Sequence, residues 1–185
     1  MLPDASRIIL NLVMLLNMEP QKIVGVDVGA SGIKGAVVDV STGELLTDRL
    51  RLPTPDPAVP EAMAETFAQL LKNLEWTNGG LVGCGFPAIV KNGVALSAAN
   101  IDHSWIGTSI EELFSEASGC PVKVLNDADA AGLAEMLFGV GQGEIGTVVL
   151  ITIGSGLGSA LFTNGHLVHN TEFGHFYMHD ILAEH

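Results

Sequence analysis

The sequence has few positive charges. Lys and Arg together number 8, against 21 Asp and Glu, which gives a formal net charge of −13. Because such an acidic chain repels phosphate backbones and anionic lipid headgroups, we expect neither nucleic acid nor a membrane surface as a partner. Any phosphate that the protein binds must be held locally, by backbone N–H groups, a metal ion or single lysines.

Cysteine is also scarce. Cys84 and Cys120 are the two cysteines of the chain, and they form no CxxC pair. Two lone cysteines in a glycine-rich chain predict buried, reduced thiols and a cytoplasmic location.

Long apolar runs are missing as well. A membrane-spanning helix needs about 20 apolar residues, whereas the apolar stretch at residues 8–18 has 11 and is interrupted by Asn11 and Asn17. This leader can be a frayed or docked helix, a non-native extension or an export signal, although no small-x-small cleavage site follows it. We therefore place residues 1–21 outside the main fold.

What remains is a globular pattern of 185 residues with 48% apolar residues and 22 glycines. Hairpins mixed with strand–helix–strand units predict an α/β protein with mixed sheets. We expect Thr108 to cap a helix, with Glu111 completing a capping box. The expected strands are residues 22–26, 35–40, 45–52, 81–86, 88–90, 94–97, 121–125, 146–153, 157–162 and 166–169, and the expected helices are residues 60–73, 108–117 and 126–138.

Two glycine-rich turns stand at equivalent places in a repeated hairpin. The first, residues 27–35, combines glycines that allow close approach to an anion with the Ser31 hydroxyl and the Lys34 charge. Asp27, at the predicted strand end, can hold a hydrated Mg²⁺. The motif is neither a Walker A loop nor GxGxxG, and an ordinary turn explains it equally well. The second turn, residues 152–158, would face it and clamp a phosphate chain.

Asn126 and Asp127 lie at a strand-to-helix junction. Either residue can simply cap the helix. In the functional interpretation Asp127 is a general base, because a sugar hydroxyl has a high pKa and a carboxylate must accept its proton as the phosphoryl group arrives. Both interpretations stay open at this point.

Three further polar positions can contact a polyol. Glu172 and His175 are separated by a glycine and can both reach hydroxyl groups, although a solvated loop is an equal alternative. We reject zinc at His175, since no cysteine follows it. Asn100 follows a predicted hairpin and can contact a sugar or form a turn.

In combination these motifs resemble the ROK family of sugar kinases, and residues 98–107 and 170–172 are most similar to its polyphosphate glucokinase branch. The resemblance covers residues 22–185. It implies the actin-like ATPase (ribonuclease H-like) fold, with two mixed-sheet α/β lobes around a cleft. We expect lobes at residues 22–125 and 126–185, the second incomplete because relatives continue with helices that complete it.

The resemblance also implies a role for each motif. Asp127 would be the base at the glucose 6-hydroxyl. The implied glucose ligands are Asn100, Asn126, Glu172 and His175. The implied phosphate-donor ligands are Asp27, Gly29, Ser31, Lys34, Thr152, Gly154, Ser155 and Gly156. The cysteine cluster that binds zinc in many relatives is missing, so we expect no zinc, and Mg²⁺ would accompany the donor with Asp27 as a possible ligand.

The leading functional hypothesis is a cytoplasmic, homodimeric glucokinase that uses ATP or inorganic polyphosphate. The sequence leaves the donor open. The alternatives are a non-catalytic sugar-sensing domain of the ROK-like kind and an inactive, truncated fragment. The net charge of −13 and the lack of a helix-turn-helix pattern before the domain argue against a DNA-binding regulator.

Overall fold

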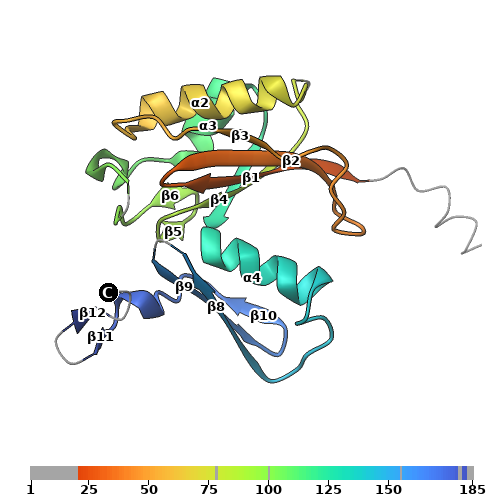
Figure 1. Cartoon of the computed structure of the whole chain (residues 1–185), viewed down its shortest axis with the longest axis vertical. Coiled ribbons are helices and arrows are strands. Elements are labelled where there is room, and N and C mark those ends of the chain that lie inside the picture. Colours follow the sequence, from red (N-terminus) through yellow and green to blue (C-terminus); the bar gives the residue numbers. More distant parts are fainter. Residues whose placement is uncertain (1–20, 78, 100, 155, 179–180, 183–185) are drawn as a thin grey trace, which may run out of the picture.

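The computed structural model describes residues 21–77, 79–99, 101–154, 156–178 and 181–182. The apolar leader at residues 8–18 lies outside the described residues, as do Asn100 and Ser155. The described residues form two larger sheets with a helix between them, and two small two-stranded hairpins (Figure 1).

The first sheet has five strands in the order β3-β2-β1-β4-β7. β1 pairs antiparallel with β2 and parallel with β4, and β4 pairs parallel with β7, so the sheet is mixed as expected. The strands are β1 (Lys22–Gly29), β2 (Gly32–Asp39), β3 (Leu50–Leu52), β4 (Val82–Phe86) and β7 (Val122–Asn126). β3 is much shorter than the expected strand at residues 45–52, because between residues 40 and 49 the chain meets β2 through a single bridge, Val38 to Leu45.

Two helices cover one face of this sheet (Figure 1). α2 (Pro60–Asn73) has the predicted bounds: Pro60 opens it with a fixed φ, and Met63, Phe67 and Leu70 are fully buried. α3 (Ile110–Ser118) begins two residues later than the expected helix at residues 108–117. Ser109, not Thr108, caps it by accepting a hydrogen bond from the Glu112 N–H, because the burial of Ile110 fixes where the first turn starts.

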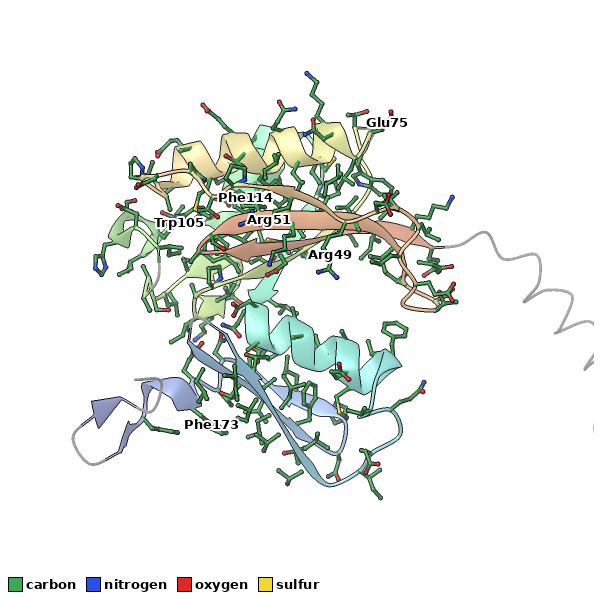
Figure 2. All side chains as sticks on the ribbon, in the orientation of Figure 1. Arg49, Arg51, Glu75, Trp105, Phe114 and Phe173 are labelled. Carbon is green, nitrogen blue, oxygen red and sulfur yellow. The ribbon has the colours of Figure 1, made fainter. Side chains whose placement is uncertain are left out.

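The core of the first sheet lies under these helices. Phe67 stacks on Phe114, and Phe86 and Trp105 pack against Phe114 and against each other. Figure 2 shows Trp105 and Phe114 under the helices. Both cysteines are buried free thiols, as predicted. Burial also raises the pKa of the Cys84 thiol, so that thiol stays protonated.

The second sheet is antiparallel, with the order β10-β9-β8. It consists of β8 (Thr147–Ile153), β9 (Leu157–Thr163) and β10 (His166–Val168). α4 (Asp127–Phe138) packs against β4 on one side and β9 on the other. A Cβ on Gly132 would lie 2.6 Å from Cβ of Ala160, so only glycine allows this helix to approach the second sheet so closely.

Short elements complete the description. They are the hairpin β5 (Val90–Lys91) and β6 (Val94–Ala95), the 3₁₀ turns η1 (His103–Trp105) and η2 (Phe173–His175), and the hairpin β11 (Tyr177–Met178) and β12 (Ile181–Leu182). None of the described helices has the length and apolar content that a membrane crossing requires.

Candidate active site

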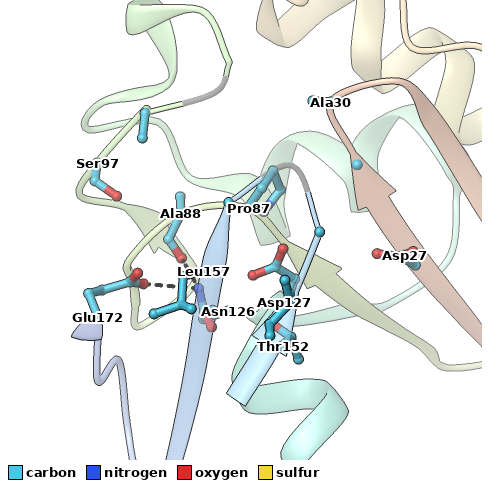
Figure 3. A pocket seen from close by; sticks show the side chains of 16 residues that line it. Asp27, Ala30, Pro87, Ala88, Ser97, Asn126, Asp127, Thr152, Leu157 and Glu172 are labelled. Carbon is cyan, nitrogen blue, oxygen red and sulfur yellow. Dashed lines mark hydrogen bonds between the residues drawn. The ribbon is translucent and has the colours of Figure 1, made fainter. Parts of the chain in front are cut away.

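A cavity of about 310 Å³ opens where β1, β4 and β7 end and the turn between β8 and β9 approaches them (Figure 3). The parts of the chain that line it are far apart in sequence. The lining residues predicted from the sequence are Asp27, Gly29, Asn126, Asp127, Thr152, Gly154, Gly156 and Glu172. Pro87, Ala88, Ser97 and Ala99 also line it, and nothing in their residue types marked them in advance.

The first glycine turn, between β1 and β2, is fixed from the side of β3. The Thr54 hydroxyl donates a hydrogen bond to the Gly29 carbonyl at 2.6 Å, and Arg51 Nη2 donates to the Ser31 carbonyl at 2.6 Å. Because a trans peptide points its N–H opposite to its C=O, the Ala30 N–H points away from Thr54. Gly29 and Ala30 line the cavity, so this turn presents backbone to whatever occupies it.

Asp27 and Lys34 face each other across the β1–β2 ladder. Lys34 Nζ lies 3.3 Å from Asp27 Oδ2. Two of the predicted donor ligands, Ser31 and Lys34, do not line the cavity. Lys34 is nevertheless next to it, because it forms an ion pair with Asp27, which does line it.

The second glycine turn, between β8 and β9, closes with a hydrogen bond from the Gly154 N–H to the Gly156 carbonyl at 3.0 Å. Gly158 follows it, and a Cβ there would lie 3.0 Å from Cβ of Ala128. Glycine at this position therefore lets the turn lie against the start of α4, next to Asp127. Ser155, also predicted to bind the donor, lies outside the described residues.

Asp127 is the first residue of α4. β4 approaches it closely, since a Cβ on Gly85 would lie 3.4 Å from Cα of Asp127. Burial raises the pKa of the Asp127 carboxyl above its ordinary value; the Ala128 N–H opposes this, and the charges of Asp27 and Asp129 raise it further. A carboxyl whose pKa moves toward neutrality is a stronger base than an ordinary aspartate.

Asn126, and not Asp127, caps α4. Its Oδ1 accepts from the Asp129 N–H at 3.0 Å, while its Nδ2 donates to the Ala88 carbonyl at 3.1 Å and to Glu172 Oε1 at 3.2 Å (Figure 3). The helix start therefore does not need the Asp127 side chain. Both the oxygen and the nitrogen of the Asn126 side-chain amide form hydrogen bonds, so this buried residue holds Glu172 at a fixed place beside Asp127.

A network behind the cavity was not predicted from the sequence. Asp129 is completely buried, and its Oδ2 accepts from the Asn170 N–H at 2.8 Å. Burial raises the pKa of this carboxyl, although the Asn170 N–H and His169 oppose the shift. Among the described residues, Asp129 Oδ1 has no hydrogen-bond partner. Through Asn126, Asp129 and Asn170, the start of α4 is tied to the segment that carries Glu172.

The same segment is fastened to β9. The Ser159 hydroxyl donates to the Thr171 carbonyl and accepts from the Phe173 N–H at 3.0 Å. These bonds flank Glu172 on both sides. Two of the predicted sugar ligands are not tested by this geometry: Asn100 lies outside the described residues, and so does the side chain of His175, whose backbone belongs to η2.

The arrangement suits phosphoryl transfer to a hydroxyl. It joins the half-buried carboxylate of Asp127 to two glycine turns on one side and to the Asn126–Glu172 pair on the other. Within the described residues, no group of three or more His, Cys, Asp or Glu is placed to hold a metal ion. Magnesium in such sites is bound by one or two carboxylates together with substrate phosphates, and Asp27 fits that limited role.

Comparison with known proteins gives the same assignment. The model of the ROK family matches residues 23–184. The chain belongs to the ROK family. It is 51% identical over 152 residues to polyphosphate glucokinase of Mycobacterium tuberculosis strain H37Rv, an alignment that covers 82% of this chain and 57% of that protein. The chain therefore spans little more than half the length of this relative.

Solved structures confirm the ROK sugar-kinase fold, which is actin-like. The inorganic polyphosphate/ATP-glucomannokinase from Arthrobacter sp. strain KM superposes with a TM-score of 0.85 at 47% identity, covering 88% of this chain and 66% of that one. A ROK family glucokinase from Streptomyces griseus, solved in complex with glucose and AMPPNP, gives a TM-score of 0.74 at 31% identity, covering 84% and 50%.

Proposed function

We propose that this chain provides the catalytic cleft of a glucokinase that transfers a phosphoryl group from inorganic polyphosphate or ATP to the 6-hydroxyl of glucose. The observation that carries the proposal is the position of Asp127. It lines one cavity together with both glycine turns and with the Asn126–Glu172 pair. A donor phosphate and a sugar hydroxyl can therefore both reach the same carboxylate.

The residues divide the work between donor and acceptor. Gly29, Gly154 and Gly156 offer backbone to the phosphates, with Lys34 and Asp27 at the edge. Asn126 and Glu172 bind sugar hydroxyls. Asp127 accepts the proton of the attacking hydroxyl as the phosphoryl group leaves the donor. The untested positions belong to the same proposal: Ser31, Thr152 and Ser155 on the donor side, and Asn100 and His175 on the sugar side.

Magnesium is part of this proposal. Asp27 would hold the ion, which would neutralise part of the charge of the donor phosphates. We include no zinc. The two sheets would be the cores of two lobes that meet near residues 125 and 126, with the sugar and the donor between them.

The wider setting is also a proposal. The ROK relatives named above are kinases by their names, and this chain would share their substrates. Two buried free thiols support a reducing, cytoplasmic location. A homodimer is expected, and light scattering of the purified protein would measure it.

A coupled assay for glucose 6-phosphate tests the function. We expect formation with polyphosphate, ATP or both, dependent on Mg²⁺, and loss of activity in Asp127→Asn. Glucose binding by calorimetry with no product from either donor would instead favour the sugar-sensing alternative. An inactive chain that also fails to bind glucose would favour the fragment alternative.

A further inference from the structure

Three cations lie along one edge of the cleft, although the chain has only 8 Lys and Arg against 21 Asp and Glu. Asp27 pairs with Lys34 across β1 and β2, and Lys34 pairs with Arg51 across β2 and β3. Residues directly opposite each other in a sheet project from the same face. Lys34 and Arg51 therefore extend from Asp27 as a row, with neighbouring strands about 4.8 Å apart.

Arg51 is fixed in this row. Its guanidinium bonds the Ser31 carbonyl at 2.6 Å, and it lies so close to Gly32 that a Cβ there would come within 2.5 Å of Nε. Guanidinium has five N–H donors, and one bond leaves most of them available. In the part of the chain that the structure describes, Arg51 forms no ion pair. Its free donors are therefore held beside the first glycine turn.

Arg49 continues the row away from the catalytic cavity. It lines a second cavity of about 490 Å³, between the first sheet and α4, together with Lys34 and Asp27. Asp27 lines both cavities, so the catalytic cavity and the cationic edge meet at that residue. Arg49 is exposed and has no ion pair among the described residues (Figure 2).

The two donors differ in the groups attached to the transferred phosphate. ATP continues with two phosphates and then a nucleoside, whereas polyphosphate continues with more phosphates, each negatively charged. A row of cations leading outward from the glycine turn matches the second kind of donor, because Arg and Lys bind phosphate through charge-assisted hydrogen bonds. In a chain with a net charge of −13, these cations reduce the repulsion that a long polyanion would otherwise meet.

We propose that Lys34, Arg51 and Arg49, here called the cationic ledge, bind the phosphates of inorganic polyphosphate beyond the one that is transferred. The inference rests on the proposed function and adds to it a residue-level basis for use of a polymeric donor. It predicts that affinity grows with polyphosphate length up to the end of the ledge, and that ATP gains little from Arg49.

The experiment measures binding of long-chain polyphosphate and of tripolyphosphate by calorimetry to the full chain and its variants. Arg49→Gln should weaken long-chain binding about tenfold, which corresponds to roughly 1.4 kcal/mol, because one charge-assisted contact is lost. Tripolyphosphate binding should change less than about twofold. Arg51→Gln should show the same loss, and Arg51→Lys, which keeps the charge, should recover part of it.

Lys72→Gln is the matched control, because this exposed lysine lies on α2, on the opposite face of the sheet. It should leave both affinities unchanged. Unchanged long-chain binding in Arg49→Gln, or an equal loss in Lys72→Gln, would overturn the ledge. An equal loss for tripolyphosphate in Arg49→Gln would overturn it too, because Arg49 would then act on the donor site itself.

Activity separates this inference from the proposed function. If the chain makes glucose 6-phosphate but the ledge variants keep their long-chain affinity, the function stands and the ledge is wrong. If the variants lose long-chain affinity while the parent protein phosphorylates no glucose from any donor, the ledge is supported and the function is wrong. Thermal melting of each variant verifies that the loss is not unfolding.

Discussion

Asn170 pairs with the backbone of Val90 as a neighbouring strand would. Its Nδ2 donates to the Val90 carbonyl and its Oδ1 accepts from the Val90 N–H, both at 2.9 Å. The two residues are 80 positions apart, one in β5 and the other after β10. Asn170 has a φ of +59°, which asparagine tolerates better than most residues. This pair fixes the segment that carries Glu172 to the wall of the cavity.

Replacing Asn170 by Ala should therefore weaken glucose binding. Both side-chain bonds to β5 are lost and the segment that carries Glu172 loosens. We therefore expect the KM for glucose to rise about tenfold, which corresponds to roughly 1.4 kcal/mol. The KM for the donor should stay within about twofold. Steady-state kinetics with each substrate varied measures this. Asn164→Ala is the control: Asn164 also has a positive φ and bonds a backbone N–H, but in the β9–β10 turn. Equal effects in both variants would contradict the role of Asn170.

Asp127→Asn should lower kcat by roughly 10²–10⁴, the range of a positioned general base. The fold should persist, because Asn126 supplies the cap of α4 and an amide can still accept from the Ala128 N–H. The glucose affinity should change much less than the rate. Calorimetry and thermal melting accompany the assay, and a variant with near-normal kcat would remove Asp127 from the mechanism.

The pH dependence of the reaction should respond to Asp27. Activity requires ionised Asp127, and the negative charge of Asp27 contributes to raising the pKa of that carboxyl. In Asp27→Asn this repulsion disappears, the pKa of Asp127 falls, and the acidic limb of kcat/KM against pH should move to lower pH. Asp39→Asn, at a partly exposed position at the other end of β2, should leave the limb in place. A limb unmoved by Asp27→Asn would mean that the two carboxyls are not coupled.

Asp129 should limit stability at neutral pH. Its raised pKa means that the folded state binds the proton more tightly than the unfolded state, so this stabilising contribution is lost as pH rises through the folded-state value. Asp129→Asn removes the buried charge and keeps an acceptor for the Asn170 N–H, and its melting temperature should exceed that of the parent increasingly as pH rises. Asp129→Ala leaves that N–H without an acceptor and should cost about 1–3 kcal/mol. An identical melting temperature at all pH values for Asp129→Asn would refute this.

The second sheet should promote self-association of the chain as it stands. Val149 and Ile151 are nearly half exposed on the face turned away from α4. Changing both to Thr keeps β-branched side chains in β8 while reducing the apolar surface, so light scattering should show less association at an unchanged melting temperature. Val148→Thr, on the face toward α4, should lower the melting temperature instead. Scattering that is unaffected by the double change would show that this face is not the cause.

Local patterns predicted much of this molecule. The spacing of Met63, Phe67 and Leu70 marked α2 correctly, and the glycine turns and the Asn126–Asp127 junction meet at one cavity as the sequence suggested. The helix depends on residues close together in the chain, where periodicity and capping rules apply. The meeting of the two turns was expected from the repeated hairpin and from the resemblance to sugar kinases, because it joins distant segments.

The features that could not be predicted depend on distant residues. The Asn170–Val90 pair, the buried Asp129 and the bond from Arg51 to the Ser31 carbonyl join segments that are 20 to 80 positions apart. No local pattern distinguishes such an arginine or asparagine from a solvated one. Lys34 was predicted as a donor ligand, but its position opposite Arg51 could not be predicted, since these two residues become neighbours only through strand register.

Gly132 sets how closely α4 packs against the second sheet. In a helix, glycine is less favourable than alanine by about 1 kcal/mol, yet here a methyl group would collide with Ala160 and approach Phe162. Both larger sheets therefore contact α4, and the second sheet does so at Gly132, where the helix has no side chain. Adding a single methyl group at this point would push the second sheet away from α4 and so change the width of the catalytic cavity, without altering any residue that lines it.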